Sequence, residues 1–492
     1  MKEDLPLVRR GSQTFRADPR RVLAQLFLPG QELTSNGRSR ADAVVDRVLA
    51  MSGEEASETL AGVYATRGPR HRGLAATFAS HYELIAHRVG EPERLSAAQR
   101  NLLGAYFTQE RAIEAAALFN PSLVPHPDQS GLATGEQRFV MSVRGVGEGH
   151  VSSVGFRSGV VGPGDTLRMD DPGLLATQGA VKPAPLGREL CGTVLAEAGF
   201  DPAMVRHVLG LLPATFTAVD IDGAASGAAS DQLAGGSGRE VLDRLRWMAA
   251  CRYDVRFAKD VPLGERVLMP VSPAESHGVE DARFVHFAED DGSHRYYATY
   301  TAYDGSRVAS HLLETEDFLT FRVSQLTGRA SRDKGMALFP RRVGGRYLAI
   351  SRWDRESIAI AASTDARNWG EPATLTRPMR PWELVQLGNC GSPIETPEGW
   401  IVLTHGVGPM RAYGIGALLL DLADPLRVIG SLPEPLMTAA DDERDGYVPN
   451  VVYSCGAMVN GQTLVVPYGC SDQQIRVAFV DLPGLLDRLT GR

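Results

Sequence analysis

Short apolar runs alternate with polar turns along most of the chain, and the runs come in pairs. Each pair has a strand-type run, a turn, and a second run that contains small residues. Five such pairs occur, at residues 138–143 and 150–156, 282–287 and 296–305, 346–351 and 358–365, 399–406 and 414–422, and 463–469 and 475–482. Five units of similar make predict five similar small sheets.

A radial array of small sheets is a β-propeller, which protects its strand edges by repetition. The pattern therefore predicts a mainly β protein built around a five-bladed β-propeller. A two-sheet sandwich is the alternative, because it also uses short paired strands. In a propeller, polar residues at the strand ends surround the central axis, and we expect the functional site there.

Residues 1–115 have a helical pattern instead. Within 41–51, four apolar side chains share one face of a helix: Val44, Val45, Val48 and Leu49. A further helix is predicted over 95–119, with Ser96 as its N-cap. The N-terminal part of the chain is therefore expected to be a helical region.

A second helical stretch covers about 186–250. One helix is predicted to begin at Pro202, with Asp201 as its cap. Between the helices, residues 222–238 are small, polar and rich in glycine, which predicts a flexible loop.

The composition is that of a folded, turn-rich protein. Of 492 residues, 43% are hydrophobic and 22% are charged, with 52 glycines and 30 prolines, which excludes a mainly disordered chain. The formal net charge of −8 gives no indication of nucleic acid binding. No apolar run is long enough for a membrane helix. The first residues lack the apolar stretch of a signal peptide, so we expect a cytoplasmic protein without a membrane partner.

The cysteines and the short motifs give no indication of a metal or a cofactor. The five cysteines are widely and irregularly spaced, at Cys191, Cys251, Cys390, Cys455 and Cys470. This spacing fits neither a zinc site nor a disulfide framework. The chain contains no P-loop, no GxSxG and no HExxH, and its glycine-rich strings lack a strand–helix dinucleotide setting.

A first polar cluster precedes the strand at 282–287. Glu280 and Asp281 come directly before it, and Arg283 follows two residues after Asp281. In an extended chain Asp281 and Arg283 share a face, whereas Glu280 points to the other. A nearby guanidinium holds an acid ionised. The alternative interpretation is a surface turn with a local ion pair.

A second cluster is strongly cationic. It occupies residues 332–356 and contains Arg332, Lys334, Arg341, Arg342, Arg346, Arg352 and Arg355. Such groups recognise phosphate or carboxylate. Basic side chains also occur on solvent-exposed edge strands, where they prevent pairing with other chains, and this is the alternative interpretation.

A third cluster combines an irregular backbone with a histidine. Gly388, Gly391 and Pro393 disrupt regular structure before a strand, which lets Asn389 or backbone amides approach a ligand. His405 ends the apolar run at 401–404, where a strand delivers a side chain into a propeller mouth. The alternative is a structural histidine.

Seven strings, taken in order, resemble glycoside hydrolase family 130, the β-mannoside phosphorylases and related β-mannosidases. They are ALFNPS (117–122), GVEDARFVHF (278–287), YYATYTAYDG (296–305), KGMALFPRRVGGRY (334–347), LGNCGSPIETPEGWIVLTHGVG (387–408), GALLLDLADPLRVIG (416–430) and GYVPNVVYSCG (446–456). The resemblance covers roughly 116–165 and 250–485 and implies a five-bladed β-propeller. It divides the chain into an N-terminal helical region (1–115), a first part of the propeller (116–175), a helical insertion (176–249) and the remainder with the active site (250–492).

The resemblance also implies an inverting reaction with one carboxylic acid as proton donor. The matching residue is Asp281, in an EDAR string where the family often has EDPR. The expected substrate-binding residues are Asn120, Ser122, Arg144, Glu280, Tyr300, Asp304, Asn389, Tyr447, Asn450 and Asp472. The expected phosphate-binding residues are Arg283, Lys334, Arg352 and His405.

Three functions are compatible with the sequence. The first is phosphorolysis of β-mannosides to mannose 1-phosphate, with inorganic phosphate as co-substrate. The second is inverting hydrolysis, which needs a carboxylate to activate water; Glu356 is the main candidate base, beside Glu280 and Asp354. The third is a non-catalytic sugar-binding propeller. The expected partner is an oligosaccharide or disaccharide substrate. Assembly of the chain into a homo-oligomer is left open.

Two departures from the family pattern keep hydrolysis open. The family string Leu-His-Arg-Pro stands here as Ile350, Ser351, Arg352 and Trp353, and Tyr447 replaces an aspartate that many phosphorylases have. If phosphate binds, we expect Lys334 and Arg352 to face the same cavity as Asp281. We further expect Arg283 to point at an anionic ligand or at Glu280. Asp281 would then be free for the sugar, with a raised pKa once a ligand excludes water.

Overall fold

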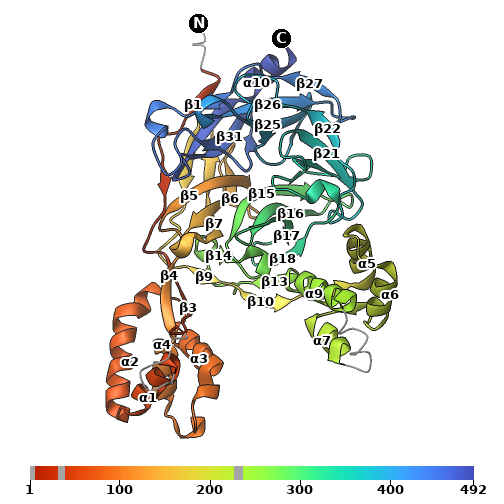
Figure 1. The fold of residues 1–492 in the computed structure, drawn as a ribbon. Coiled ribbons are helices and arrows are strands. Elements are labelled where there is room, and N and C mark those ends of the chain that lie inside the picture. Colours follow the sequence, from red (N-terminus) through yellow and green to blue (C-terminus); the bar gives the residue numbers. More distant parts are fainter. Residues whose placement is uncertain (1–5, 31–38, 227–235, 492) are drawn as a thin grey trace.

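Antiparallel strands dominate the computed structural model, which describes residues 6–30, 39–226 and 236–491 (Figure 1). All five predicted strand pairs are antiparallel hairpins, so that prediction is confirmed. They are β6 (Gln137–Val146) with β7 (Ser152–Gly162), β15 (Gly278–Ala288) with β16 (His294–Tyr303), β20 (Tyr347–Ser351) with β21 (Ile358–Ser363), β25 (Gly399–Val407) with β26 (Tyr413–Leu420), and β31 (Thr463–Cys470) with β32 (Gln474–Asp481). The described residues form six sheets, not the two of a sandwich.

Three of these sheets each extend one C-terminal hairpin. The first adds β19 (Ala337–Leu338) and β22 (Ala373–Thr376) to β20 and β21. The second adds β23 (Gln386–Asn389), β24 (Ile394–Thr396), β27 (Val428–Ser431) and β28 (Met437–Thr438) to β25 and β26. The third adds β29 (Val452–Tyr453), β30 (Met458–Asn460), β1 (Val8–Arg10) and β2 (Phe15–Arg16) to β31 and β32. Because β1 and β2 pair with β32, the N-terminal and C-terminal parts of the chain share one sheet.

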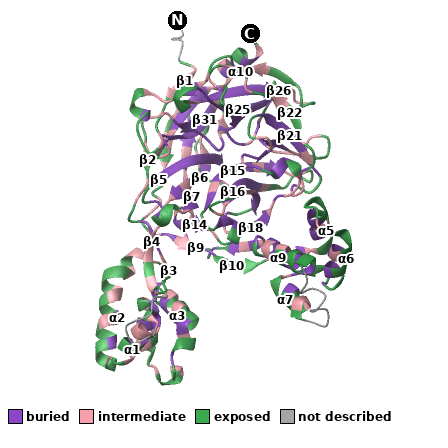
Figure 2. Ribbon diagram, viewed as in Figure 1, coloured by how far each residue is buried: buried purple, intermediate pink, exposed green. Residues whose placement is uncertain are grey.

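The largest sheet has twelve strands and contains two hairpins. One set consists of β5 (Ala117–Pro125), β6, β7 and β8 (Thr166–Met169), and the other of β15, β16, β17 (Val308–Thr315) and β18 (Thr320–Gln325). The sets join where Gly278 of β15 pairs with Ser152 of β7. Four short strands, β9 (Thr177–Gln178), β10 (Ala180–Pro183), β13 (Tyr253–Arg256) and β14 (Arg266–Leu268), complete the sheet. Buried residues concentrate in the long strands (Figure 2).

The N-terminal helices stand apart from the sheets (Figure 1). They are α1 (Arg40–Leu49), α2 (Gly53–Arg67), α3 (Leu74–Ile85) and α4 (Ala97–Tyr106). In the chain they lie between β3 (Val22–Leu26) and β4 (Thr108–Ala112), which pair with each other. Ser96 caps α4, as predicted. The predicted helix over 95–119 is wrong beyond Tyr106, because tertiary pairing with β3 and β6 overrides helix propensity there. The described part of 1–115 also contributes β1, β2 and β3, so it is not helical throughout.

The segment predicted to be a helical insertion, which we call the insertion, contains α5 (Arg188–Glu197), α6 (Pro202–Gly210), α7 (Ala218–Ser226) and α9 (Gly236–Ala250), with the small sheet of β11 (Leu186–Gly187) and β12 (Thr215–Phe216). Asp201 caps α6 through its side chain, as predicted. The predicted loop at 222–238 is helical at both ends, and residues 227–235 lie outside the described residues. The insertion has a hydrophobic core of its own and lies beside β13 and β18 (Figure 1). Among the described helices, none is long and apolar enough to cross a membrane.

Candidate active site

A bulge at the start of β15 places two carboxylates beside one arginine. The pairing of β15 with β16 shifts between Glu280 and Arg283, and Asp281 has φ +55°. Arg144 of β6 donates to Glu280 at 2.5 Å and to Asp281 at 3.2 Å. The expectation that these two acids point to opposite faces is therefore wrong, because the bulge interrupts the alternation of the strand. Bulges of this kind re-aim side chains next to active sites.

A second irregularity, in β5, brings an amide to the same carboxylate. The register of β5 shifts between Phe119 and Ser122, and Asn120 has φ +48°. Asn120 Nδ2 donates to Asp281 Oδ1 at 2.6 Å. Ser122 instead accepts from the backbone N–H of Phe284 at 3.0 Å, so it ties β5 to β15.

The surroundings of Asp281 hold it ionised. Burial raises its pKa, but the charges of Arg144, Arg283 and Lys334 and the hydrogen bond from Asn120 lower the pKa to about 2. The sequence led us to expect Asp281 to be free for the sugar, and this is wrong because Arg144 pairs with it at 3.2 Å. The raised pKa is expected only for the site with a bound sugar, so it stays a prediction.

Asp472 is a second carboxyl close to Asp281. It follows β31 with φ +50°. Burial and the negative charge of Asp281 raise its pKa to about 6, against the opposing charges of Arg144, Arg411 and Lys334. Neighbouring acids whose pKa values are driven apart are typical of acid–base sites. We call Asn120, Arg144, Glu280, Asp281 and Asp472 the carboxylate cluster.

Arg283 connects this cluster to a cationic one. Its guanidinium is buried and donates to the Asp281 carbonyl at 3.0 Å and to the Tyr453 hydroxyl at 2.7 Å. It therefore points at Tyr453 and not at Glu280, which corrects one of the two orientations expected from the sequence. Its Nε has no hydrogen-bond partner among the described residues.

His405 is buried and neutral. Burial, followed by the charges of Arg352 and Arg283, lowers its pKa well below the usual value. Nδ1 donates to the Asn389 carbonyl at 3.3 Å, so Nε2 is the acceptor for Arg352 at 3.4 Å. The Tyr453 ring lies 4.8 Å from the imidazole ring.

Gln386 and a glycine position Arg352. With its amide oxygen turned toward Arg352, Gln386 accepts from both terminal nitrogens of the guanidinium. A Cβ on Gly388 would lie 2.5 Å from His405 Cε1 and 2.6 Å from Arg352 Cδ, so only glycine allows this close packing. We call Arg283, Arg352, Gln386, His405 and Tyr453 the cationic cluster.

Lys334 and Asn389 border the two clusters. Lys334 is half-buried and makes no hydrogen bond or ion pair within the described chain, although its charge lowers the pKa of Asp281 and of Asp472. The Asn389 side chain donates to the Gly391 carbonyl at 3.1 Å. Gly391 has φ +100°, which agrees with the irregular backbone predicted for this segment.

Tyr300 and Asp304 make contacts elsewhere. The Tyr300 hydroxyl donates to the buried Glu275, which also accepts from Tyr253. Asp304 closes the turn after β16, where it accepts from the backbone N–H of Ser306 at 2.8 Å. Within the described residues, neither side chain makes a hydrogen bond or an ion pair with either cluster.

Three further predicted residues have no side-chain hydrogen bond in the described structure. Glu356 is exposed in a turn where Asp354 accepts from its backbone N–H at 3.1 Å. Tyr447 is 67% exposed. Asn450 has φ +63°, and its carbonyl accepts from the N–H of Tyr413 at 3.0 Å.

Sequence reasoning missed Gln386, Arg411 and Tyr453. Gln386 and Tyr453 lie beside or within the family strings, but their roles follow only from contacts with Arg352 and Arg283. Among the described residues, no group of three or more His, Cys, Asp or Glu side chains could hold a metal ion.

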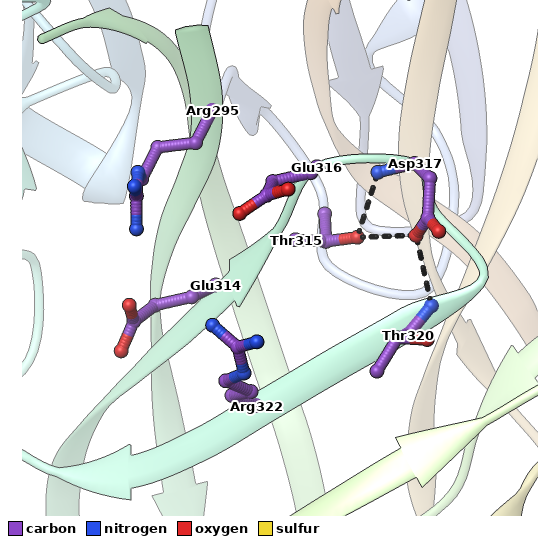
Figure 3. A pocket seen from close by; sticks show the side chains of 7 residues that line it. All are labelled: Arg295, Glu314, Thr315, Glu316, Asp317, Thr320 and Arg322. Atoms are coloured by element: carbon purple, nitrogen blue, oxygen red, sulfur yellow. Dashed lines mark hydrogen bonds between the residues drawn. The ribbon is translucent and has the colours of Figure 1, made fainter. Parts of the chain in front are cut away.

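A charged cavity at the other end of β17 is separate from these clusters (Figure 3). It has a volume of about 190 Å³ and is lined by Arg295, Glu314, Thr315, Glu316, Asp317, Thr320 and Arg322. Glu314 is paired with Arg367, and Asp317 accepts from the backbone of Thr320. These internal contacts are those of a turn, and the cavity contains no predicted site residue.

Fold and site together define a mainly β protein with a buried carboxylate held among arginines. A family model described as β-1,4-mannooligosaccharide phosphorylase matches residues 258–490. The 1,2-β-oligomannan phosphorylase of Thermoanaerobacter sp. (strain X514) is 33% identical over 231 residues, 45% of this chain and 74% of that protein. The chain belongs to glycoside hydrolase family 130, and the resemblance seen in the sequence is confirmed.

Two further likenesses concern Listeria innocua. Its β-1,2-mannobiose phosphorylase (serovar 6a) is 32% identical over 230 residues, 45% of this chain and 63% of that protein. A solved structure of the β-1,2-mannobiose phosphorylase in complex with β-1,2-mannobiose aligns over 78% of this chain and 94% of that chain, with a TM-score of 0.44 and 21% identity. The matched family region, 258–490, contains Asp281 and the cationic cluster but not Asn120 or Arg144.

Proposed function

We propose that this protein cleaves β-mannosidic linkages by phosphorolysis, with inversion, and releases mannose 1-phosphate. The observation that carries the proposal is the buried Asp281 within reach of the charges of Arg144, Arg283 and Lys334. Curated relatives named as mannoside phosphorylases support the same reaction. The substrate would be a β-linked manno-disaccharide or oligosaccharide, and inorganic phosphate the co-substrate.

In this proposal Asp281 donates the proton to the departing oxygen through a sugar hydroxyl. A general acid must hold a proton when the bond breaks, whereas the pKa of Asp281 is about 2 without ligand. A phosphate beside Lys334 and Arg352 would cancel part of the positive field around Asp281. Its binding would therefore raise the pKa of Asp281 and couple proton donation to the presence of the nucleophile.

Lys334 and Arg352 are proposed to hold the phosphate. Lys334 has no partner within the described chain, and Arg352 is fixed by His405 and Gln386. Neutral His405 then positions Arg352 and adds no charge of its own. Replacing Lys334 by Ala should raise the KM for phosphate about tenfold or more, because charge-assisted contacts to an anion are strong. The KM for the mannoside should change less, and equal increases in both would contradict the assignment.

Hydrolysis is the second candidate function. Asp472 is a better candidate than Glu356 for the base that activates water. Asp472 has a pKa of about 6 and is therefore largely ionised at neutral pH, close to Asp281. An ionised carboxylate there is a candidate base for water. Glu356 is exposed and makes no side-chain hydrogen bond within the described residues.

We also propose that five strand sets are the five blades of a propeller. The sets are β5–β8, β15–β18, β19–β22, β23–β28, and β29–β32 with β1 and β2. The residues of both clusters come from β5, β6 and β15 and from strands or loops of the last three sets, as expected for a site at a common axis. The domain boundaries and the homo-oligomeric state stay predictions. All five cysteines are buried free thiols, which supports the proposed cytoplasmic location.

The test is product identification with and without phosphate. The protein is incubated with β-1,2- and β-1,4-linked manno-oligosaccharides. Phosphate-dependent formation of mannose 1-phosphate is expected. Free mannose at the same rate in both conditions would favour hydrolysis, and no turnover of any β-mannoside would contradict both reactions.

A further inference from the structure

A cavity of about 570 Å³ lies between the helical insertion and the sheets. Helices α5 and α9 form one wall, through residues such as Glu197 and Arg244. The opposite wall comes from β17, β18 and the segment 326–332, through Ser310, Gln325 and Arg332. We call this space the insertion cavity, and no residue of the carboxylate or cationic cluster lines it.

The insertion cavity borders the sheet that contains β15, the strand of Asp281, at the end where Asp281 lies. Ser310 pairs with Thr301 across β17 and β16, and Thr301 pairs with Glu280 across β16 and β15. Ser310 is thus two strand spacings from Glu280, about 10 Å. The cavity and Asp281 therefore lie at the same end of neighbouring strands.

One short segment connects the cavity to the proposed phosphate site. Ser331 and Arg332 line the cavity, and Lys334 follows two residues later. Ser310 Oγ donates to the Asp333 carbonyl at 2.6 Å, which fixes this segment to β17. A ligand in the cavity would therefore lie against the segment that delivers Lys334 toward Asp281.

The cavity contains polar side chains that the protein itself leaves unused. Gln325 and Arg332 make no side-chain hydrogen bond or ion pair in the described structure. Arg244 lies over the Trp247 ring at 4.4 Å and has no carboxylate partner there. Such donors are available to a ligand.

The two walls are also joined to each other. Glu197 of α5 accepts from Asn368, in the loop between β21 and β22, at 3.5 Å. On the sheet side of the cavity, Arg329 of the segment 326–332 pairs with Glu371 of the loop after β21 at 2.9 Å. The hydrogen bond between Asn368 and Glu197 thus links the insertion to the sheets beside the cavity.

We propose that the insertion cavity is a saccharide subsite for sugar units remote from the cleaved bond. Guanidinium and amide donors beside carboxylate acceptors match the hydroxyl groups of a sugar. The distance of about two strand spacings requires an oligosaccharide longer than a disaccharide. This inference rests on the proposed function, since it takes the ligand to be a β-mannoside.

The test compares short and long substrates. Three variants alter the cavity: Arg332→Ala, Gln325→Ala, and Ala198→Trp, which fills it from the C-cap position of α5. Arg239→Ala is the control, because Arg239 is on α9, is exposed and, among the residues that the structure describes, pairs only with Asp243. We expect kcat/KM for mannotetraose to fall about tenfold in Arg332→Ala, the effect of losing a hydrogen bond to a charged group, and about threefold or more in Gln325→Ala, where the lost hydrogen bond is neutral. Ala198→Trp should lower it by occupying the space that the sugar needs. The value for mannobiose should stay within about twofold, and the control should match the wild type for both.

Equal losses on mannobiose and mannotetraose, or no loss on either, would overturn the subsite. Turnover of mannobiose by the wild type reports separately on the proposed function. Should the wild type cleave neither substrate, calorimetric titration with β-1,2- and β-1,4-mannotetraose still tests the cavity. Weaker binding in the variants than in Arg239→Ala supports the subsite, and unchanged or undetectable binding rejects it.

Discussion

At the scale of single residues, the site is marked by an unusual backbone. Asn120, Asp281, Asn450 and Asp472 all have positive φ, between 48° and 63°. Asparagine and aspartate tolerate this region better than most residues, yet each such position costs roughly 1 kcal/mol or more. Strain of this kind clusters where side chains must be aimed at a ligand. Three of these four residues, Asn120, Asp281 and Asp472, belong to the carboxylate cluster, whereas Asn450 lies outside both clusters.

Replacing Asp281 by Asn tests the proposed proton donor. An amide keeps the shape and the contact with Asn120 but cannot donate a proton in the same way. Turnover should fall at least about 100-fold, the usual contribution of a general acid, while circular dichroism and thermal unfolding show a folded protein. Glu280→Gln is the matched comparison, with a smaller loss expected. Near-normal activity of Asp281→Asn would instead make Glu280 the leading candidate.

The raised pKa of Asp472 predicts a pH dependence of stability. Its pKa is about 6 in the folded protein and near 3.8 in the unfolded chain. Between these values the folded state binds more protons, so this group makes stability fall as pH rises from about 4 to 6. The full penalty, at most about 3 kcal/mol, applies above pH 6.

Urea unfolding at pH 4 and pH 7 measures this effect. Asp472→Asn removes the titrating group. The free energy of unfolding of this variant should therefore exceed that of the wild type at pH 7, and the difference should be smaller at pH 4. A wild type and variant that differ equally at both pH values would show that Asp472 titrates normally.

At the scale of elements, irregular strands aim the functional side chains. The register shifts in β5 and β15 turn Asn120 and Asp281 toward one another across neighbouring strands. In the sheet of β23 and β25, Gly388 lies opposite His405 and leaves room for its ring and for Arg352. Without the register shifts, Asn120 and Asp281 would point in other directions. A side chain at Gly388 would displace His405 and Arg352.

Gly388→Ala tests the close packing around His405. The added Cβ would clash with His405 and Arg352, so both side chains must shift. We expect a loss of about 1–3 kcal/mol in unfolding free energy and about a tenfold or larger loss of activity. Gly187→Ala is the control, since a Cβ there meets nothing within 4 Å. Full activity of Gly388→Ala would show that the arrangement of Arg352 and His405 is not needed.

At the scale of the whole molecule, the last sheet is completed by the N-terminal strands. Val8 pairs with Val480 and Phe15 with Ile475, so β32 has partners on both of its edges. Arg9 is also paired with Asp165, far away in sequence. The fold therefore depends on β1 and β2, which precede the N-terminal helices in the chain but pair with the C-terminal strand β32.

Removing residues 1–16 tests this closure. The truncation leaves β32 with an unpaired edge, which lowers the thermal midpoint and promotes association through that edge. Adding a synthetic peptide of residues 6–16 should restore part of the midpoint by supplying the missing strands. A scrambled peptide of the same composition is the control. An unchanged midpoint after truncation would show that β1 and β2 contribute little to stability.

Much of the fold and the family could be predicted from the sequence, because those features depend on local patterns. Paired apolar runs specify hairpins wherever one strand follows its partner directly, and all five were found. Caps such as Ser96 and Asp201 act within one helical turn, so they were also predictable. The order of the family strings located Asp281 without any structure.

Only the tertiary structure decided the partners of those residues, because the contacts join strands far apart in sequence. Arg144 lies 136 positions from Glu280, and Arg283 lies 170 positions from Tyr453. The segments 8–16 and 108–119 were misread because their strands pair with distant segments, which overrides a local helical pattern. Local sequence sets the elements and the types of side chain, whereas the lowered pKa of Asp281 and the space beside the insertion arise only when distant strands meet.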